Sequence, residues 1–184
     1  MKILVTGKNG QLGKSIQKTV NTDNKIDNNH SPNDFIFVGR GDLDLSSESS
    51  ISHYFKNNKF DIIINCAAYT QVDRAEQEAE LANQINHLAI KQLASIASNQ
   101  QAKLLHISTD YVFEGDCNKP YLETDTPHPI NVYGKTKLAG EKALQILMPM
   151  NALVIRTSWL YSEYGNNFVK TMLKLGKERD ELSL

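Results

Sequence analysis

Short apolar runs alternate with longer helix-like patterns along this chain. The runs are nearly continuous blocks of aliphatic and β-branched residues, typical of strands covered on both faces, at 2–5, 35–38, 62–64, 104–107 and 153–155. Between the first two runs, Leu12, Ile16 and Val20 recur every four residues, which predicts a helix. A similar spacing predicts a second helix over 81–96, and we expect a third over 132–147.

The alternation of strands and helices predicts a parallel α/β sheet with right-handed crossovers. Leu43 and Leu45 predict one further short strand, which would make six. We therefore expect a Rossmann-like, doubly wound sheet with strand order 3-2-1-4-5-6 and helices on both faces. Residues 21–34, rich in Asn and Asp, are typical of a polar surface loop, and residues 181–184 resemble the start of another strand.

Composition narrows the class of protein. The length of 184 residues, with 40% hydrophobic and 22% charged, fits one globular domain. The net charge of -1 shows no basic excess, so nucleic acid is not an expected partner. No apolar run approaches the roughly 20 residues of a membrane helix, and the N-terminus is unlike a signal peptide. Cys66 and Cys117 form no CxxC pair and the histidines lack metal-binding spacing, so we expect a cytoplasmic protein with reduced thiols and no metal site.

A glycine-rich turn follows the first apolar run. Gly7, Gly10 and Gly13 have the spacing GxxGxxG. Gly7 suits a tight turn, Gly10 would let the backbone approach a pyrophosphate, and Gly13 would let the helix pack on the strand. The start of that helix would offer N–H groups to phosphates. An ordinary glycine-rich turn is the alternative, but the position after an N-terminal strand favours dinucleotide binding.

The end of the second apolar run bears on the choice of cofactor. An acidic side chain at this point would favour NAD, because it bonds the ribose hydroxyls. The chain has Arg40 instead, whose guanidinium suits the 2′-phosphate of NADP. The sequence therefore favours NADP, with a solvated Arg40 that binds no ligand as the alternative.

Tyr133 and Lys137 form a YxxxK pair in the third predicted helix, where residues at i and i+4 share one face. An ammonium beside a phenol favours the phenolate and lowers the tyrosine pKa. Tyr133 could then give or take a proton near neutral pH, as carbonyl reduction requires. Because this spacing also arises by chance, its meaning depends on the residues around it.

Hydroxyl and small residues follow two of the other runs. Ser108 and Thr109 end the fourth run, where a ligand of an open α/β sheet would bind, so both could hydrogen-bond a substrate carbonyl. Local capping is their commoner use. Ala67 and Ala68 follow the third run and would let a cofactor, or a packed helix, lie close. Cys66 is expected to be an inert buried thiol.

These motifs occur in a fixed order: GKNGQLG (7–13), AAYTQVDRAE (67–76), STDYVFEG (108–115), NVYGKTKLAGEKAL (131–144) and RTSWLY (156–161), with GNNF (165–168) beyond. Together they resemble the extended short-chain dehydrogenase/reductase superfamily, and within it the reductases that act on the C4 ketone of dTDP-linked sugars. The resemblance touches nearly the whole chain. It implies a dTDP-sugar substrate and NADPH, or alternatively NADH, as the hydride donor.

The resemblance also implies roles for individual residues. Tyr133 would protonate the C4 oxygen, Lys137 would hold the nicotinamide ribose and tune Tyr133, and Thr109 would stabilise charge on the carbonyl oxygen. The implied cofactor contacts are Gly10, Gln11 and Leu12 at the pyrophosphate, Asp44 and Leu45 at the adenine side, and Ala67, Ala68 and Tyr69 at the middle. Asp110 and Trp159 would face the sugar nucleotide, although Trp159, the only Trp, could equally belong to the core.

The sequence departs from its relatives at one motif and in length. Sugar-nucleotide dehydratases of the superfamily have an Asp-Glu pair after the Thr, whereas here Asp110 precedes Tyr111, which favours ketone reduction. Chains of the family continue further, into a smaller substrate-binding lobe. We therefore expect 1–184 to be the NADP(H)-binding domain with the catalytic residues, and most of that lobe to be absent.

Several alternatives stay open at this point. A non-catalytic subunit that binds a dinucleotide and a partner enzyme is one, and an epimerase or reductase of another sugar nucleotide is a second. A few relatives bind Mg²⁺ through the missing lobe, so the resemblance alone raises that ion. A homodimer is left open as the assembly.

Overall fold

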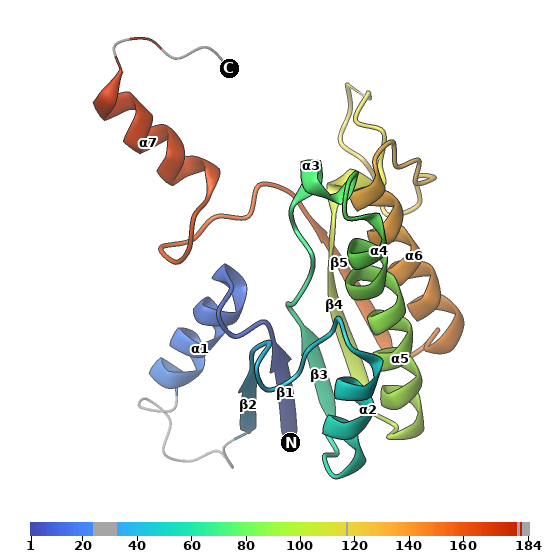
Figure 1. Ribbon diagram of the computed structural model, residues 1–184. Helices are drawn as coiled ribbons and strands as arrows, with labels where there is room; N and C mark the ends of the chain where they lie inside the picture. The colour runs from blue at the N-terminus through green and yellow to red at the C-terminus, as the bar shows by residue number, and fades with distance from the viewer. Residues whose placement is uncertain (24–32, 117, 180, 182–184) are drawn as a thin grey trace.

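The chain folds around one parallel β-sheet, and the computed structural model describes residues 1–23, 33–116, 118–179 and 181 (Figure 1). The strands are β1 (Lys2–Thr6), β2 (Asp34–Val38), β3 (Ile62–Asn65), β4 (Lys103–Thr109) and β5 (Ala152–Thr157). They lie in the order β2-β1-β3-β4-β5, and every neighbouring pair is parallel. All five apolar runs of the sequence thus form strands, which confirms the predicted Rossmann-like parallel sheet.

The additional strand predicted from Leu43 and Leu45 does not form. It was strand 3 of the predicted order 3-2-1-4-5-6, which was therefore wrong at that edge, while the other five strands follow the predicted order. The backbone N–H groups of Asp42 and Leu43 both donate to the carbonyl of Gly39, at 3.0 and 2.9 Å, which closes a turn. Both leucine side chains are buried, at 4% and 5% exposed. The alternation of Asp and Leu here reflects a turn that sends its leucines into the core.

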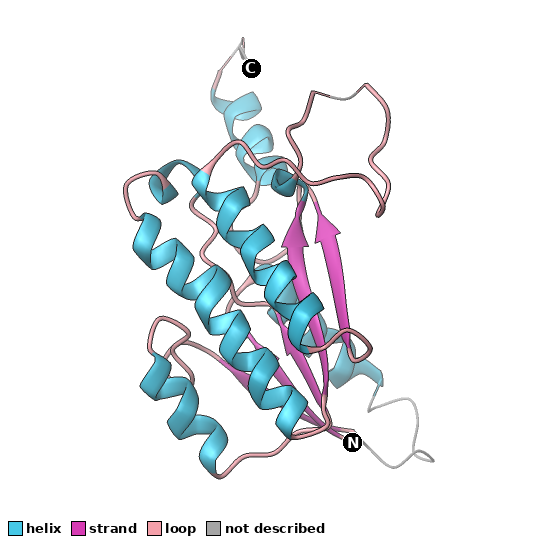
Figure 2. Cartoon of the chain, turned by 90° about the vertical axis from the view of Figure 1, so that its right-hand side faces the viewer, coloured by secondary structure: helices cyan, strands magenta, loops and turns pink. Residues whose placement is uncertain are grey.

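Helices cover both faces of the sheet (Figures 1 and 2). α1 (Gln11–Asp23) lies on one face, and α2 (Glu48–Lys56), α5 (Ala89–Asn99) and α6 (Val132–Leu147) lie on the other. The short α3 (Val72–Ala75), α4 (Ala79–Asn83) and the π-helix η1 (Gln84–Leu88) lead into α5, the 3-10 turn η2 (Asp110–Val112) follows β4, and α7 (Phe168–Glu178) follows β5. The three predicted helices are confirmed, whereas the π-helical turn inside the second was not predicted.

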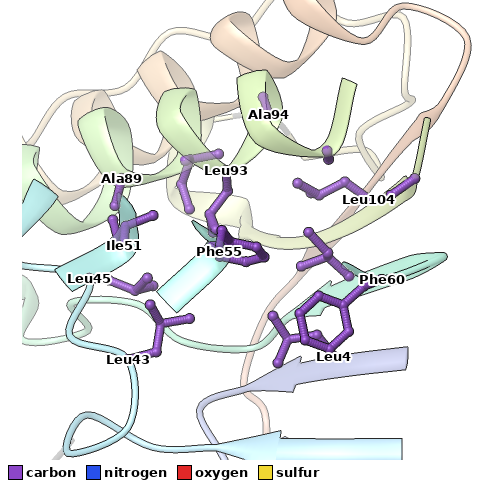
Figure 3. Packing of buried hydrophobic residues seen from close by; sticks show 14 of the residues in the cluster. Leu4, Leu43, Leu45, Ile51, Phe55, Phe60, Ala89, Leu93, Ala94 and Leu104 are labelled. Atoms are coloured by element: carbon purple, nitrogen blue, oxygen red, sulfur yellow. The ribbon is translucent and has the colours of Figure 1, made fainter. Parts of the chain in front are cut away.

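The main core lies between the sheet and the layer of α2, α5 and α6 (Figure 3). Leu4 of β1 and Ile63 of β3 are fully buried there, and Leu93 of α5 packs against them from the helix layer. These contacts fix the strands relative to the helices. The carboxyl ends of β1, β3 and β4 therefore present their polar residues along one edge.

α6 starts at a defined residue because Asn131 caps it. The backbone of Asn131 is extended, and its side-chain oxygen accepts the N–H of Gly134 at 2.7 Å. This is the usual arrangement of a helix N-cap. The cap sets the rotation of the first turn of α6, and with it the direction in which Tyr133 and Lys137 project.

α7 lies apart from the sheet, and none of its residues is buried (Figure 1).

Of the predicted surface loop, residues 21–23 belong to α1 and Asp34 begins β2, while 24–32 lie outside the described residues. Cys117 and residues 182–184 also lie outside them, so the strand predicted at the end of the chain is not tested. Among the helices that the structure describes, none has the length and apolarity to cross a membrane.

Candidate active site

The glycine turn connects β1 to α1 at the carboxyl edge of the sheet. Gly7 has a positive φ of 71°, and a Cβ there would lie 2.9 Å from the Ala67 nitrogen. A Cβ on Gly13 would overlap the Gly7 carbonyl oxygen, so α1 packs directly on the turn. Gly10 is exposed at the start of α1, where the first N–H groups of a helix lack partners within the helix. This cradle fits the pyrophosphate of a dinucleotide.

Gln11 and Leu12 belong to the first turn of α1. The Gln11 side chain points to the segment before α7: its Nε2 donates to the carbonyl of Leu160 at 3.4 Å, and its Oε1 accepts from Asn167 at 3.0 Å. Leu12 is half-buried. Because the Gln11 side chain is occupied, the backbone of this turn is the part that could bind a phosphate.

Two cations stand at the end of β2. Arg40 is exposed and its Nε lies 3.3 Å from an Asp44 oxygen. Lys8, from the glycine turn, contacts Asp42 at 2.6 Å, and this bond lowers the pKa of the Asp42 carboxyl. The sequence singled out Arg40 and missed Lys8. Together they form a surface that suits a 2′-phosphate better than neutral ribose hydroxyls.

The residues that the resemblance places at the adenine side differ in their surroundings. Asp44 is half-buried, and its Oδ1 accepts hydrogen bonds from both the backbone and the hydroxyl of Ser46, at 2.9 and 2.6 Å. Leu45 packs in the main core instead. The Leu45 side chain therefore supports the turn from below, and only its backbone could border a nucleotide.

The segment after β3 is held from both sides. The backbone N–H of Ala67 donates to the Thr6 hydroxyl at 3.2 Å. Asn86 of η1 bonds both backbone groups of Tyr69: Oδ1 accepts its N–H at 2.9 Å, and Nδ2 donates to its carbonyl at 3.1 Å. Ala67 and Ala68 are half-buried beside the glycine turn. The small side chains thus form a fixed floor where the predicted cofactor would lie.

Thr109 ends β4 and caps η2. Its Oγ1 accepts the N–H of Tyr111 at 3.2 Å and donates to Asp110 at 3.0 Å. The capping role that the sequence left open for this residue is therefore present. Ser108 is buried, and its hydroxyl has no hydrogen-bond partner within the described part of the chain. Asp110 is exposed at this edge, where its carboxylate accepts the hydroxyl of Thr109.

Tyr133 lies in the first turn of α6, 9% exposed, with the Tyr111 ring edge-on at 5.7 Å between centroids. Burial raises the pKa of Tyr133, while a hydrogen bond with the Thr109 hydroxyl acts in the opposite direction. Thr109 therefore lies near enough to Tyr133 to affect its pKa. The predicted lowering of the Tyr133 pKa was wrong, because burial outweighs the other contributions.

Lys137 is fully buried one turn further along α6, at 1% exposed. Its Nζ donates to the Ile107 carbonyl at 2.6 Å and lies 3.2 Å from Nε2 of His106. Burial lowers the pKa of Lys137 to about 8, and the carboxylate of Glu141 opposes this. Glu141 is itself buried and forms a two-pronged ion pair with Arg156 of β5, the shortest contact being 2.7 Å.

Sequence reasoning missed Asn65, Asn86, His106 and Glu141. His106 stands inside an apolar run and Asn65 directly follows one, and a polar residue in a buried strand is the signal that could have found them. Glu141 follows Lys137 by one helical turn, as Lys137 follows Tyr133. Nothing local in the sequence distinguishes Asn86.

Trp159 lies on the segment between β5 and α7 and is 69% exposed. Its ring packs edge-on against Phe168 at 4.6 Å, and its φ is positive, at 49°. Within the described part of the chain, Trp159 therefore lies outside the main core. The exposed position leaves the indole accessible to a ligand.

Two further predictions concern reactive side chains. Cys66 is half-buried, and burial raises its pKa to about 12, so the thiol is protonated and inert, as predicted. Within residues 1–23, 33–116, 118–179 and 181, no group of three His, Cys, Asp or Glu side chains could hold a metal ion. The Mg²⁺ that the resemblance raised thus gains no support from this part of the chain.

Comparisons with known proteins agree with this geometry. The profile of the family described as RmlD substrate binding domain matches residues 1–184. The dTDP-4-dehydrorhamnose reductases of Escherichia coli (strain K12) and Aggregatibacter actinomycetemcomitans are 44% and 42% identical to this chain over 185 and 183 residues. These alignments take in all of this chain and 60% of each relative, so the chain spans about 60% of the length of the curated relatives.

Solved structures give the same match. A dTDP-4-dehydrorhamnose reductase of Clostridium acetobutylicum superposes with a TM-score of 0.89 at 44% identity, over 99% of this chain and 61% of that one. The enzyme of Bacillus anthracis, in complex with NADP, gives 0.88 at 43%, over 100% and 62%. A UDP-glucose 4-epimerase of Thermus thermophilus, 17% identical, shares the fold alone, with a TM-score of 0.78.

Proposed function

Since the chain belongs to the dTDP-4-dehydrorhamnose reductase (RmlD) family, we propose that it reduces the C4 ketone of dTDP-4-dehydro-L-rhamnose to dTDP-L-rhamnose with NADPH. Residues 1–184 serve in this proposal as the NADP(H)-binding domain that carries the catalytic residues. The observation that supports the proposal is that Thr109 ends β4 at the carboxyl edge of the sheet, where the first turns of α6 bring Tyr133 against Tyr111 and Lys137 against the Ile107 carbonyl.

Each of these side chains has a chemical task that its surroundings support. The raised pKa keeps Tyr133 protonated at neutral pH, so it can donate a proton to the oxygen that forms at C4. Thr109 lies near enough to Tyr133 to oppose the rise of its pKa, and it can turn its hydroxyl from Asp110 toward the same oxygen. In this proposal Lys137, whose amine is bonded here to the Ile107 carbonyl, holds the ribose beside the nicotinamide. NADPH, when bound, supplies the hydride.

The preference for NADPH over NADH rests on the end of β2. Arg40 and Lys8 offer cationic donors there, and each is neutralised by a carboxylate that a phosphate can replace. The enzyme of Bacillus anthracis, 43% identical, was crystallised with NADP. The cradle formed by Gly7, Gly10 and Gly13 fits the pyrophosphate of either cofactor.

The contacts to the sugar nucleotide remain predictions. Asp110 and Trp159 are exposed near the ends of β4 and β5, where they can reach a ligand that lies beyond the sheet edge. Tyr111 occupies the place where a dehydratase of the superfamily has Glu, and its ring packs on Tyr133. The Tyr at this position supports reduction rather than elimination.

The assembly of the protein as a homodimer stays a prediction.

The test is an assay of the protein at its full natural length with NADPH and dTDP-4-dehydro-L-rhamnose, in which cofactor oxidation and the product sugar are followed together. We expect turnover, and a loss on the order of 10²–10⁴-fold in Tyr133→Phe, because the proton donor is removed. Tyr54→Phe, on α2, is the matched control and should keep full activity.

Other outcomes identify the alternatives. Tight NADPH binding without turnover of any dTDP sugar would indicate the dinucleotide-binding subunit. NAD retained through purification would indicate an epimerase. Turnover that survives Tyr133→Phe would contradict the mechanism proposed above.

A further inference from the structure

Three neighbouring strands present a row of buried polar side chains beneath Lys137. Thr6 of β1 is paired in register with Asn65 of β3, and Asn65 with His106 of β4. All three are at most 2% exposed. The Thr6 hydroxyl donates to Asn65 at 2.5 Å, Asn65 contacts His106 at 2.9 Å, and His106 contacts Lys137 at 3.2 Å. The row therefore leads from the glycine-turn strand to the buried amine.

The hydrogen bonds of Asn65 determine how its amide points. The Thr6 hydroxyl accepts the N–H of Ala67 and gives its own proton to Oδ1 of Asn65. Nδ2 of Asn65 then donates to the Ala67 carbonyl at 3.2 Å and to Nδ1 of His106. Exchanging the amide oxygen and nitrogen would place two oxygen atoms against each other at Ala67. Nδ1 of His106 is therefore an acceptor.

A neutral imidazole that accepts at Nδ1 carries its proton on Nε2. Burial, with the Lys137 charge beside it, lowers the pKa of His106 well below its ordinary value, so the ring is neutral. The Nε2–H points at Nζ of Lys137. An ammonium has no lone pair, so this contact is a hydrogen bond only when the Lys137 amine is uncharged.

The groups around Lys137 thus act in opposite directions. His106 favours the neutral amine, whereas the Ile107 carbonyl and the Glu141 carboxylate favour the ammonium. Arg156 of β5 faces Glu141, Asn86 of η1 is uncharged and bonds Thr136 of α6, and Tyr133 lies one turn away. A balance of this kind keeps the two forms of the amine close in free energy.

We propose that His106 is a positioning residue for Lys137: held by Asn65 as the Nε2–H tautomer, it fixes Nζ in place and stabilises the uncharged amine. This inference rests on the proposed function for its catalytic meaning, since Lys137 is there the partner of Tyr133. The geometry itself is independent of that function. A tautomer can be measured whether or not the protein turns over a sugar.

The experiment is nitrogen NMR of the histidine rings in the labelled protein, with exposed His53 as the internal reference for a ring in contact with water. We expect His106 to be the neutral Nε2–H tautomer throughout the stable pH range. An Nδ1–H tautomer or an imidazolium would overturn the proposal.

Titration of the Lys137 amine in Asn65→Leu provides the second test. Leucine keeps the volume of Asn65 but cannot donate to Nδ1, so the ring is free to turn its lone pair toward Lys137. We expect the titration of Lys137 to move upward by about one pH unit, the size of one buried hydrogen bond. The alkaline limb of NADPH-dependent reduction should move with it. An unchanged titration in a folded variant would overturn the proposal, whereas a role in packing alone would lower stability without this shift.

Discussion

At the scale of single residues, the buried amine of Lys137 dominates the electrostatics of the site. Its pKa is about 8 in the folded chain, below the ordinary value of 10.5, so the unfolded chain binds more protons between these pH values. Stability should therefore rise as pH increases from about 8 to 10.5, and the charged amine destabilises the fold below about 8. This residue is expected to be retained for its chemistry and at the expense of stability.

Substitution of this lysine tests that expectation. Lys137→Met should abolish the rise in stability and should stabilise the chain at neutral pH by at most about 3 kcal/mol. Urea unfolding at a series of pH values measures both effects. Lys142→Met, exposed on the same helix, is the control and should retain the rise. A Lys137→Met protein that keeps the pH dependence would show that another group causes it.

We expect single side chains to decide the choice of cofactor as well. Arg40→Ala should weaken NADPH binding about tenfold or more, since a charge-assisted hydrogen bond is lost, and should leave NADH binding unchanged. Isothermal titration calorimetry with both cofactors measures the ratio of the NADPH and NADH dissociation constants. Lys56→Ala, exposed on α2, controls for the loss of one positive charge. Equal weakening of NADPH and NADH would place Arg40 away from the 2′-phosphate.

The sequence identified the residues of this site that carry recognisable spacing. Tyr133 and Lys137 are one helical turn apart, and the structure places them on one face of α6. His106 was not predicted, because its role depends on contacts with Asn65 of β3 and Lys137 of α6, which are distant in the chain. The direction of the Tyr133 pKa shift was not predicted for a related reason: the burial that raises this pKa is a property of the packed structure and not of the YxxxK spacing.

At the scale of elements, we expect the contact between the glycine turn and α1 to decide whether a dinucleotide can bind. A methyl group on Gly13 would overlap the Gly7 carbonyl and push α1 away from the turn. We expect Gly13→Ala to lower stability by about 1–3 kcal/mol and to weaken NADPH binding. Thermal unfolding and calorimetry measure the two effects.

The matched control for this substitution lies on α7. A Cβ on Gly176 meets no atom within 4 Å, so Gly176→Ala should leave binding unchanged and should slightly stabilise the helix. Full NADPH affinity in Gly13→Ala would contradict the role assigned to this contact.

The ion pair between Glu141 and Arg156 joins α6 to the edge strand β5. Because Glu141 is buried, Glu141→Leu leaves the Arg156 guanidinium without its partner and should cost about 3–5 kcal/mol. The double variant Glu141→Leu, Arg156→Met should recover most of that loss, since neither charge is left behind. A cycle of the two single variants and the double variant, measured by urea unfolding, gives the coupling. Additive losses would show that the pair does not act as a unit.

The strands were predictable because each is a short apolar block between polar segments, a pattern that follows from burial on both faces. The π-helical turn of η1 was not, because it is fixed by Asn86 bonding the backbone of Tyr69 across the fold. The strand predicted from Leu43 and Leu45 failed because side-chain burial alone does not distinguish a strand from a turn packed on the core.

At the scale of the whole molecule, the two faces of the sheet are covered unequally (Figure 1). Burial alternates along β5: Ala152 and Val154 pack against the main core, whereas Leu153 and Ile155 are 57% and 41% exposed. For residues 1–184 taken alone, these exposed apolar side chains favour binding of apolar molecules and self-association. This face is therefore the part of the described chain where solubility should be most sensitive to substitution.

This imbalance can be measured with an apolar fluorescent dye. The chain should bind the dye in its folded state, and Leu153→Lys with Ile155→Lys should remove most of the signal. Ile146→Lys is the control, because Ile146 is exposed on the outer side of α6 and away from this face. A signal that persists in the double variant and falls in the control would locate the apolar surface on the helix layer.

The bonds that Gln11 makes to Leu160 and Asn167 have a mechanical consequence. With the ion pair between Lys18 and Glu163 at 2.5 Å, they join the first helix of the chain to the segment that leads into the last. A shift of the segment that leads into α7 can therefore reach the first turns of α1 through these side chains, in addition to the covalent path through β5.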